Sequence, residues 1–354
     1  MSLRVVLRSP FGDQVVRDIV DGRWAEPSGV GDDTLGEGMW ALPGLADAHS
    51  HLPAARLDYR SGDPVEAMER ARHALSAGVT LILDKGWCDD TTMRVIESVP
   101  PTERPDIEAA ARVLAAVDGH VAGFAREVPE GELGQAVREE AGSGAGWVKM
   151  FGDWPRKGRG PVANFTEGEL RQAVGVAESL GARVAVHTMA REAPSLAVAA
   201  GAHSIEHGMF LEEDDLETLA GRGGMWVPTV LRCEMTLAQL GEGSSGGRLF
   251  VEGLERFRRL LPLGVEAGVH VLAGTDLVGT PSDVGAEAIA LGRYGLSNHQ
   301  ALRSVSTAAF AATGRDHSFT PGVPADAVLF PADPLIDLGV LAHPARVIRR
   351  GQVR

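Results

Sequence analysis

Short apolar segments alternate with amphipathic stretches along most of this chain. Apolar segments separated in this way by helices are typical of βα units that build a parallel sheet. From residue 42 onward we count eight of them: Leu42–Asp47, Val79–Asp84, Ile107–Val117, Gly146–Phe151, Arg183–His187, Ala202–His207, Gly224–Val230 and Val269–Asp276. Eight units in series predict an α/β fold, a (β/α)8 TIM barrel with its active site at the C-terminal ends of the strands.

Two of the intervening stretches carry clear helix signals. Thr166 and Glu169 form a capping-box pattern, and the helical spacing that follows stops at Gly181. The same reasoning predicts a helix over Ser297–Thr313. The glycine-rich stretch 241–247 is expected to be a mobile loop.

The two ends of the chain depart from this pattern. They contain short segments of alternating apolar and polar residues, as expected of half-buried strands: Leu3–Leu7, Gln14–Ile19, Asp326–Phe330 and Arg346–Arg350. Because the first and last units of a closed barrel are neighbours, both ends of the chain can meet in space. We therefore predict a small composite β-sandwich domain from residues 1–40 and 321–354, beside a barrel of residues 41–320.

Composition and charge narrow the range of functions. The 354 residues are 44% hydrophobic, with no apolar run near the ~20 residues that span a bilayer, and the N-terminal residues lack a signal-peptide core. Cys88 and Cys233 are too few for a disulfide framework, so we expect a cytoplasmic protein. A net charge of −14 argues against nucleic acid as a partner. The expected partner is a small-molecule substrate, and a homo-oligomer is compatible with the sequence.

The candidate chemistry gathers where the predicted barrel strands end. His49 and His51 are two residues apart, and residues at this spacing point to the same side of a strand, so both rings can reach one metal ion. Lys149 lies in a predicted buried strand, where a charge is costly unless it is paired or chemically altered. Three further segments end in candidate ligands: His187, His207 and Asp276. Five strands that each end in a candidate ligand predict a metal site.

These motifs resemble the amidohydrolase superfamily, and the resemblance covers nearly the whole chain. The strand-one signature Pro-Gly-Leu-x-Asp-x-His-x-His stands at Pro43–His51. Further matching segments are Val186–Thr188, Ser204–Gly208, Gly274–Asp276 and Gly322–Leu329. The lysine on strand four, followed by these histidine motifs, looks most like the binuclear, carboxylated-lysine type, and within it the Xaa-Pro dipeptidase and ochratoxinase branch.

The resemblance implies a site for two divalent metal ions, for which zinc is our first expectation. The implied ligands are His49, His51, Lys149, His187, His207 and Asp276. The first two histidines and Asp276 would hold one ion, the other two histidines would hold the second, and Lys149 would bridge both as a carbamate. A shared hydroxide would be the nucleophile, and Asp276 would be the catalytic group that moves its proton to the leaving group. The alternative for Lys149 is a salt-bridged structural lysine.

Loop residues at the same end of the barrel are candidates for substrate binding. They are His120, Arg156, Lys157, Arg159 and Arg232. His120 follows strand three, where relatives with a glycine-histidine pair suggest contact with substrate. The basic cluster of residues 156–159, and Arg232 after strand seven, can pair with a substrate carboxylate. A solvated surface position is the alternative for each.

Two acidic residues and the remaining histidines carry weaker signals. Asp47 either supports the ligand His49 or makes a plain strand-end hydrogen bond. Glu206 is expected to point away from the barrel lumen and to form a salt bridge behind its strand. Structural or solvent-exposed roles are expected for His73, His203, His270, His299, His317 and His343.

The sequence therefore predicts a metal-dependent amidohydrolase of EC 3.4 or 3.5 type that cleaves a C–N bond in an amide, dipeptide-like or N-acyl amino acid substrate. Three alternatives stay open. The first is a mononuclear deaminase or imidazolonepropionase-like enzyme, although Ala190 stands where many deaminases of the family have glutamate. The second is a lactonase or organophosphate hydrolase. The third is a non-catalytic barrel, against which the complete ligand set argues.

Overall fold

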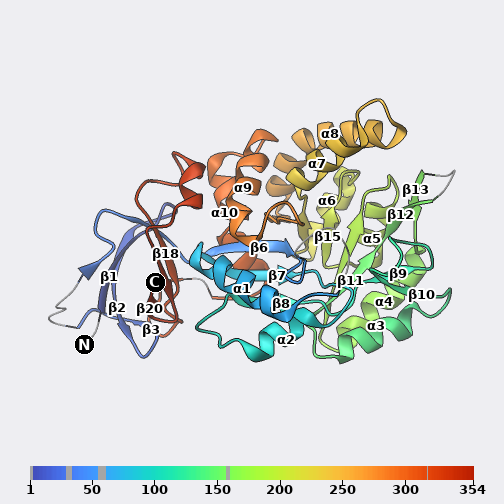
Figure 1. Ribbon diagram of the computed structural model, residues 1–354. Helices are drawn as coiled ribbons and strands as arrows, with labels where there is room; N and C mark the ends of the chain where they lie inside the picture. The colour runs from blue at the N-terminus through green and yellow to red at the C-terminus, as the bar shows by residue number, and fades with distance from the viewer. Residues whose placement is uncertain (1–2, 29–33, 55–60, 157–159, 317) are drawn as a thin grey trace.

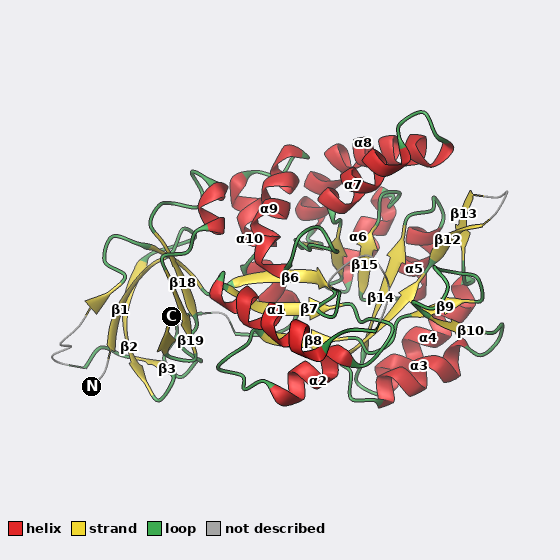
Figure 2. Cartoon of the chain, viewed as in Figure 1, coloured by secondary structure: helices red, strands yellow, loops and turns green. Residues whose placement is uncertain are grey.

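The computed structural model describes residues 3–28, 34–54, 61–156, 160–316 and 318–354. Figure 1 shows two regions: a sheet that contains both chain ends, and a larger region of parallel strands surrounded by helices. Figure 2 shows the same division by secondary structure, with the helices on the outside of the larger region. Within the described residues, each helix is too short or too polar to cross a bilayer.

The N- and C-terminal segments form one sheet. Its strands are β1 (Leu3–Arg8), β2 (Gln14–Val20), β3 (Arg23–Ala25), β4 (Thr34–Leu35), β5 (Trp40–Leu42), β18 (Ala327–Phe330), β19 (Arg346–Arg349) and β20 (Gln352–Val353). They follow the order β20-β19-β18-β5-β1-β2-β3, with β4 beside β1. The four predicted terminal strands are therefore confirmed, while β3, β4, β5 and β20 are additional. Since hydrogen bonds join all these strands in a single sheet, the two-layered sandwich stays a prediction.

The larger region contains two parallel sheets, of order β6-β7-β8 and β10-β9-β11-β14-β15-β16-β17. Their strands are β6 (Leu45–Ser50), β7 (Val79–Asp84), β8 (Asp106–Ala109), β9 (Leu114–Ala116), β10 (Arg126–Val128), β11 (Trp147–Phe151), β14 (Arg183–Thr188), β15 (Ser204–His207), β16 (Met225–Val227) and β17 (His270–Val271). A separate antiparallel hairpin, β12 (Asp153–Arg156) and β13 (Gly160–Ala163), follows β11. Nearly continuous burial along these parallel strands explains their apolar runs.

Amphipathic helices cover the outside of the parallel strands. They are α1 (Pro64–Ser76), α2 (Thr91–Ser98), α3 (Leu133–Gly142), α4 (Glu167–Ser179), α5 (Ala193–Ala200), α6 (Glu213–Gly221), α7 (Val230–Leu240), α8 (Ser245–Ala267), α9 (Val284–Arg293), α10 (Asn298–Ser304) and α11 (Thr307–Ala312). In α4 the buried residues Leu170, Ala173, Val174 and Ala177 recur every three or four positions, which places them on one face. The predicted capping box at the start of α4 is confirmed.

Several predicted segments are interrupted in the structure. Leu42–Asp47 is divided between β5 and β6, Ile107–Val117 between β8 and β9, and only two residues of Val269–Asp276 are assigned as strand. The Ser297–Thr313 helix breaks into α10 and α11, because the Val305 carbonyl accepts a hydrogen bond from Ala46 N (2.7 Å) instead of continuing the helix. Periodicity alone does not show such tertiary hydrogen bonds.

The region after β16 also differs from the prediction. The predicted strand Gly224–Val230 ends at Val227, and Val230 begins α7. The stretch 241–247, predicted as a mobile loop, is short and partly helical, since α7 ends at Leu240 and α8 begins at Ser245. Ser244 Oγ accepts a hydrogen bond from Gly247 N (2.8 Å) and so caps α8.

Arg349 connects the terminal sheet to the parallel strands. Its side chain is fully buried, and its guanidinium donates to Asp326 Oδ2 and to Asp106 Oδ1, both at 2.6 Å. Asp326 directly precedes β18, whereas Asp106 begins β8. Removing one partner of a buried ion pair leaves an uncompensated charge, so this contact fixes the two regions relative to each other.

The chain passes from the terminal sheet (β5) to the parallel strands (β6) at Gly44, a position that we expect to tolerate only glycine. A Cβ atom added at Gly44 would lie 1.7 Å from Thr80 Oγ1, so one of the two segments must move. We expect Gly44→Ala to lower the free energy of unfolding by about 3 kcal/mol, as overpacked core substitutions do. Urea denaturation measures this, with Gly12→Ala as the control because no heavy atom lies within 4 Å of that added Cβ. Equal stability of the two variants would contradict the expectation.

Candidate active site

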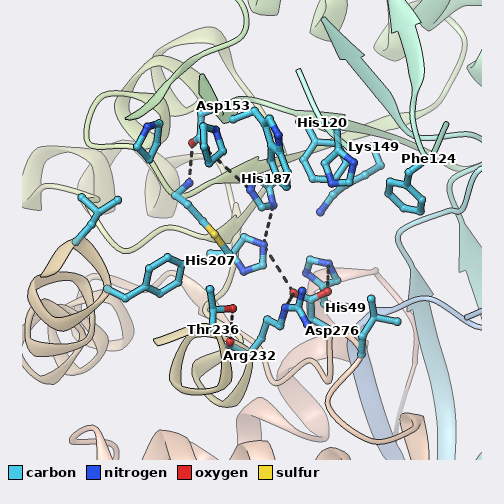
Figure 3. A pocket seen from close by; sticks show the side chains of 18 of the residues that line it. His49, His120, Phe124, Lys149, Asp153, His187, His207, Arg232, Thr236 and Asp276 are labelled. Carbon is cyan, nitrogen blue, oxygen red and sulfur yellow. Dashed lines mark hydrogen bonds and ion pairs between the residues drawn. The ribbon is translucent and has the colours of Figure 1, made fainter. Parts of the chain in front are cut away.

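One cavity of about 230 Å³ opens at the C-terminal ends of the parallel strands (Figure 3). Its lining contains all six residues that the sequence analysis proposed as metal ligands: His49, His51, Lys149, His187, His207 and Asp276. They come from β6 and the residue after it, from β11, β14 and β15, and from the segment that follows β17. The structure therefore brings these side chains together from five separate parts of the chain.

His49, His51 and Asp276 form a compact group with the geometry of a metal site. One ligand atom from each lies within 4.8 Å of the others. Asp276 Oδ1 is 3.5 Å from His49 Nε2 and 3.6 Å from His51 Nε2. Burial alone would raise the pKa of Asp276, but the facing histidines and Arg232 hold it well below its ordinary range. The group therefore presents two imidazoles and one carboxylate.

His187 and His207 form a second group beside the first. His207 Nε2 lies 2.9 Å from His187 Nδ1 and 3.9 Å from Asp276 Oδ2, as Figure 3 shows. His207 has a φ of +64°, in the left-handed region, and this turns its side chain out of the strand's alternation. Asp276 thus lies between the two groups of histidines.

Oxygen atoms on the far sides of three histidines determine which ring nitrogen carries a proton. His51 Nδ1 is 2.6 Å from Gly86 O, and His49 Nδ1 is 2.6 Å from Glu206 Oε2. Carbonyl and carboxylate oxygens only accept, so both Nδ1 atoms must be protonated. Thr229 Oγ1 donates to Pro228 O (2.8 Å) and therefore accepts from His207 Nδ1 (2.6 Å). In all three rings the Nε2 lone pair is left facing the cavity.

Lys149 has the environment of a chemically altered lysine. Its side chain is 1% exposed, and Nζ has no hydrogen-bond or ion-pair partner within the described part of the chain. Burial, opposed by Glu206, lowers the pKa of Lys149 to about 8. A buried amine without a partner is costly, and its neutral form is a nucleophile.

The structure corrects our expectation for Glu206. Its side chain is buried among the parallel strands, where it contacts His49 and forms an ion pair with Lys85 Nζ at 3.1 Å. Ser204 Oγ donates to its Oε1 at 2.6 Å. We expected His207 to follow the normal strand alternation, which would have turned Glu206 outward. The left-handed backbone at His207 allows both residues to face inward.

Two further carboxylates hold the backbone around the site. Asp47 accepts from His49 N (3.1 Å), Thr275 N (3.0 Å) and Thr275 Oγ1 (2.6 Å), which is the strand-end hydrogen bonding that we considered for it. Asp153 Oδ2 accepts from the amides of Met189 and Ala190, just after β14. Its Oδ1 is 4.0 Å from His187 Nε2, and burial raises the pKa of Asp153 to about 7.

The predicted substrate-binding residues separate into three groups. His120 and Arg232 line the cavity. Arg156 does not belong to the cavity lining, because its guanidinium donates to Val117 O (2.8 Å) and to Asn164 Oδ1 (3.0 Å) and so fastens the β12–β13 hairpin. We therefore withdraw Arg156 as a substrate contact. Lys157 and Arg159 lie outside the described residues.

Arg232 and His120 present different chemistry to the cavity. Arg232 Nε is 3.8 Å from Asp276 Oδ2, and its buried Nη1 has no hydrogen-bond partner among the described residues. His120 is stacked with Phe151, Trp154 and Phe124, at ring-centroid distances of 3.7, 4.2 and 4.8 Å. Burial lowers the pKa of His120 to about 3, so its ring is neutral. Arg232 is thus a cation available to an anionic ligand, and His120 belongs to an aromatic wall.

The sequence analysis missed the apolar wall opposite the metal-ligand candidates. It comes from the β12–β13 hairpin and from the α7–α8 pair, and its residues include Trp154, Pro155, Pro161, Leu240, Leu249 and Phe250. The Trp-Pro pair in an otherwise basic loop was a signal for one half of this wall. The other half had none, because an apolar residue on an amphipathic helix normally indicates packing.

The fold is shared with solved hydrolases and defines a TIM-barrel-like α/β protein. A Xaa-Pro dipeptidase with bound methionine has a TM-score of 0.84 at 19% identity, covering 100% of both chains. Ochratoxinase of Aspergillus niger has a TM-score of 0.80 at 19% identity, covering 99% of this chain and 95% of the other.

Sequence comparison gives the family. An uncharacterized protein of Mycobacterium tuberculosis is 34% identical over 352 residues, which cover 94% of this chain and 90% of the relative. Aspergillus niger ochratoxinase is 26% identical over 231 residues, 61% of this chain and 47% of its own length. The amidohydrolase family model matches residues 40–354, so the chain belongs to the amidohydrolase family, whose members are metal-dependent hydrolases. The family predicted from the motifs is confirmed, and the similar proteins include a Xaa-Pro dipeptidase and ochratoxinase, the branch that the motifs resemble.

The buried histidines predict a specific pH dependence of stability. Burial lowers the pKa of His207 to about 3, whereas an unfolded histidine has a pKa near 6.5. Below pH 6.5 the unfolded chain binds a proton that the folded chain does not, so stability falls as the pH falls. For one such ring the loss between pH 7 and pH 5 is about 2 kcal/mol.

The measurement is urea denaturation of chelator-treated protein across this pH range. His207→Asn keeps a side-chain N–H for Thr229 but cannot titrate, so its stability should fall about 2 kcal/mol less than that of the wild type. The exposed His343 serves as the control, and His343→Asn should follow the wild type. Parallel curves for the wild type and His207→Asn would refute a buried, neutral His207.

Proposed function

We propose that this protein is a binuclear metal-dependent hydrolase that cleaves a C–N bond in an amide, dipeptide-like or N-acyl amino acid substrate. The observation that carries the proposal is Lys149, a buried amine that lines the cavity together with the histidines and Asp276 and has no hydrogen-bond partner among the described residues. Addition of its neutral form to CO2 forms an N–C bond with loss of one proton, and the resulting carbamate has two oxygens with which to join two cations.

The residues present fit two divalent ions. His49, His51 and Asp276 would hold one, His187 and His207 would hold the other, and carboxylated Lys149 would bridge them. Neutral imidazole and carboxylate ligands suit zinc, which is our first expectation. Three of these histidines, His49, His51 and His207, already present an Nε2 lone pair to the cavity. When bound, such ions would supply a hydroxide at neutral pH.

Asp276 is placed to move the proton in this reaction. It is a carboxylate located between both histidine groups, so it can accept the proton of the attacking water and donate it to the leaving nitrogen. Asp276 N in turn donates to His49 O (2.8 Å), which fixes the backbone of the acid-base residue to that of a ligand.

Arg232 and the apolar walls define the type of substrate. The guanidinium of Arg232 provides the charge for a substrate carboxylate, since its Nη1 has no partner among the described residues. Aromatic and aliphatic side chains form the opposite walls of the cavity. An N-acyl amino acid or dipeptide with a bulky apolar group fits both features.

We also infer a closed eight-stranded barrel over residues 41–320, with residues 1–40 and 321–354 as a separate small domain. Two hydrogen bonds support closure on one side, from Ala48 N to Ala273 O (2.9 Å) and from Asp276 N to His49 O. A parallel bridge between Ala110 and Trp147 joins the two sheets on the other side. The eight-stranded terminal sheet supports the composite domain.

Metal content tests the binuclear site. We expect about two divalent ions per chain in the wild type by elemental analysis, because six ligands converge from five parts of the chain. Lys149→Ala removes the bridging group, so its content should fall to one ion or fewer. Arg156→Ala is a matched control, since Arg156 lies outside the cavity lining. One ion in both the wild type and Lys149→Ala would favour a mononuclear site and defeat the proposal.

Substrate kinetics test the role of Arg232. A panel of N-acyl amino acids and dipeptides is assayed together with the same compounds blocked as carboxamides. We expect Arg232→Met to raise KM for the free acids by roughly 10–100-fold, which is the loss of a charge-assisted contact, and to change KM for the carboxamides little. An equal effect on both series would show that Arg232 does not bind the carboxylate.

A further inference from the structure

The N-terminus of α7 lacks the capping side chain that its sequence offers. Thr229 stands in the N-cap position, where a threonine hydroxyl ordinarily accepts from the first turn's amides. Here Thr229 adopts left-handed angles, φ 47° and ψ 55°, and makes no side-chain cap hydrogen bond. Its hydroxyl contacts His207 Nδ1 and Pro228 O instead. The hydroxyl of Thr229 therefore supports the ring of His207, a metal-ligand candidate, and does not cap α7.

A residue of another helix takes over the cap. Glu287 of α9 accepts from Val230 N through Oε1 (2.6 Å) and from Leu231 N through Oε2 (3.0 Å). The side chain is 1% exposed, and both oxygens are used by the first turn of α7. Glu287 thus satisfies the two amides that Thr229 leaves without an acceptor.

The residues on either side of these two amides, Thr229 and Arg232, both act at the cavity. Arg232, a cation of the cavity, follows Leu231 directly in the first turn of α7. Thr229, which directly precedes α7, fixes the ring of His207. Both residues lie within two positions of an amide held by Glu287. A shift of this turn would therefore move the carboxylate-binding candidate and the support of a metal-ligand candidate together.

We propose that Glu287 is a positioning residue that sets, through the first turn of α7, both the placement of Arg232 and the orientation of His207. The inference rests on the proposed function for the roles of these two residues. Glu287 does not line the cavity, so it acts only through the turn. The amidohydrolase motifs quoted above do not include it.

A second contact between α7 and α9 offers a matched control for Glu287. Glu234 of α7 accepts from Arg293 Nη2 (2.9 Å) and from Tyr294 Oη (3.0 Å), which lie at the end of α9. It joins the same two helices as Glu287 does, but it is partly exposed and does not touch the amides of the first turn. Glu234→Gln therefore reports the effect of loosening the helix pair without disturbing the cap.

Two measurements on Glu287→Gln test the proposal. The amide keeps one acceptor oxygen and loses the other, so the fold should survive while the turn loosens. Cobalt-reconstituted protein reports the histidine ligands by its visible absorption, without any substrate. The ratio of KM values for an N-acyl amino acid and its carboxamide reports Arg232. In Glu287→Gln we expect a changed cobalt spectrum and a five- to tenfold loss of the preference for the free acid, roughly the effect of losing one hydrogen bond. In Glu234→Gln we expect neither change.

Other outcomes overturn the inference. Wild-type values in both measurements, a change in only one of them, or equal changes in Glu234→Gln would each show that Glu287 does not position both residues. Amide hydrogen exchange at Val230 and Leu231 gives a third reading, and it should accelerate at least tenfold in Glu287→Gln and not in Glu234→Gln. If no compound is hydrolysed, the proposed function fails, whereas the cobalt spectrum and the exchange rates still decide the role of Glu287.

Discussion

The candidate site depends on the hydrogen bonds that join the first and last strand segments of the parallel region. Asp47 binds the backbone of His49 and of Thr275 through one buried carboxylate, and Asp276 N donates to His49 O. The bonds between Asp47 and Thr275 cross 228 positions of sequence, and together with the others they bring two histidines and the acid-base candidate into one group. A carboxylate that binds the backbone and one hydroxyl group therefore determines the geometry of the site.

A second layer of polar groups lies beneath the cavity, inside the strands. Lys85 is paired with Glu206, its amine lies 4.7 Å above the Trp147 ring, and Glu206 reaches up to His49. Burying charges is favourable only when each has a partner with good geometry. In this layer Glu206 lies close to both Lys85 and His49, and so it connects the interior of the parallel strands to a ring that lines the cavity.

Sequence patterns predicted the order of strands and helices and the set of residues that converge, because both follow from local periodicity and from the rule that parallel strands end at one face. Two features could not be predicted in this way. The inward position of Glu206 depends on a left-handed backbone at His207, which no residue type at that position signals. The exclusion of Arg156 from the cavity depends on acceptors at Val117 and Asn164, 39 and 8 positions away. Both are outcomes of tertiary contacts that leave periodicity unchanged.

The two buried lysines of the interior differ in how closely one carboxylate approaches them. Lys85 and Lys149 are each 1% exposed, and both interact electrostatically with Glu206. Glu206 approaches Lys85 to 3.1 Å, whereas Lys149 Nζ has no partner of this kind among the described residues. Glu206 therefore gives Lys85 a close charged partner that Lys149 lacks among the described residues.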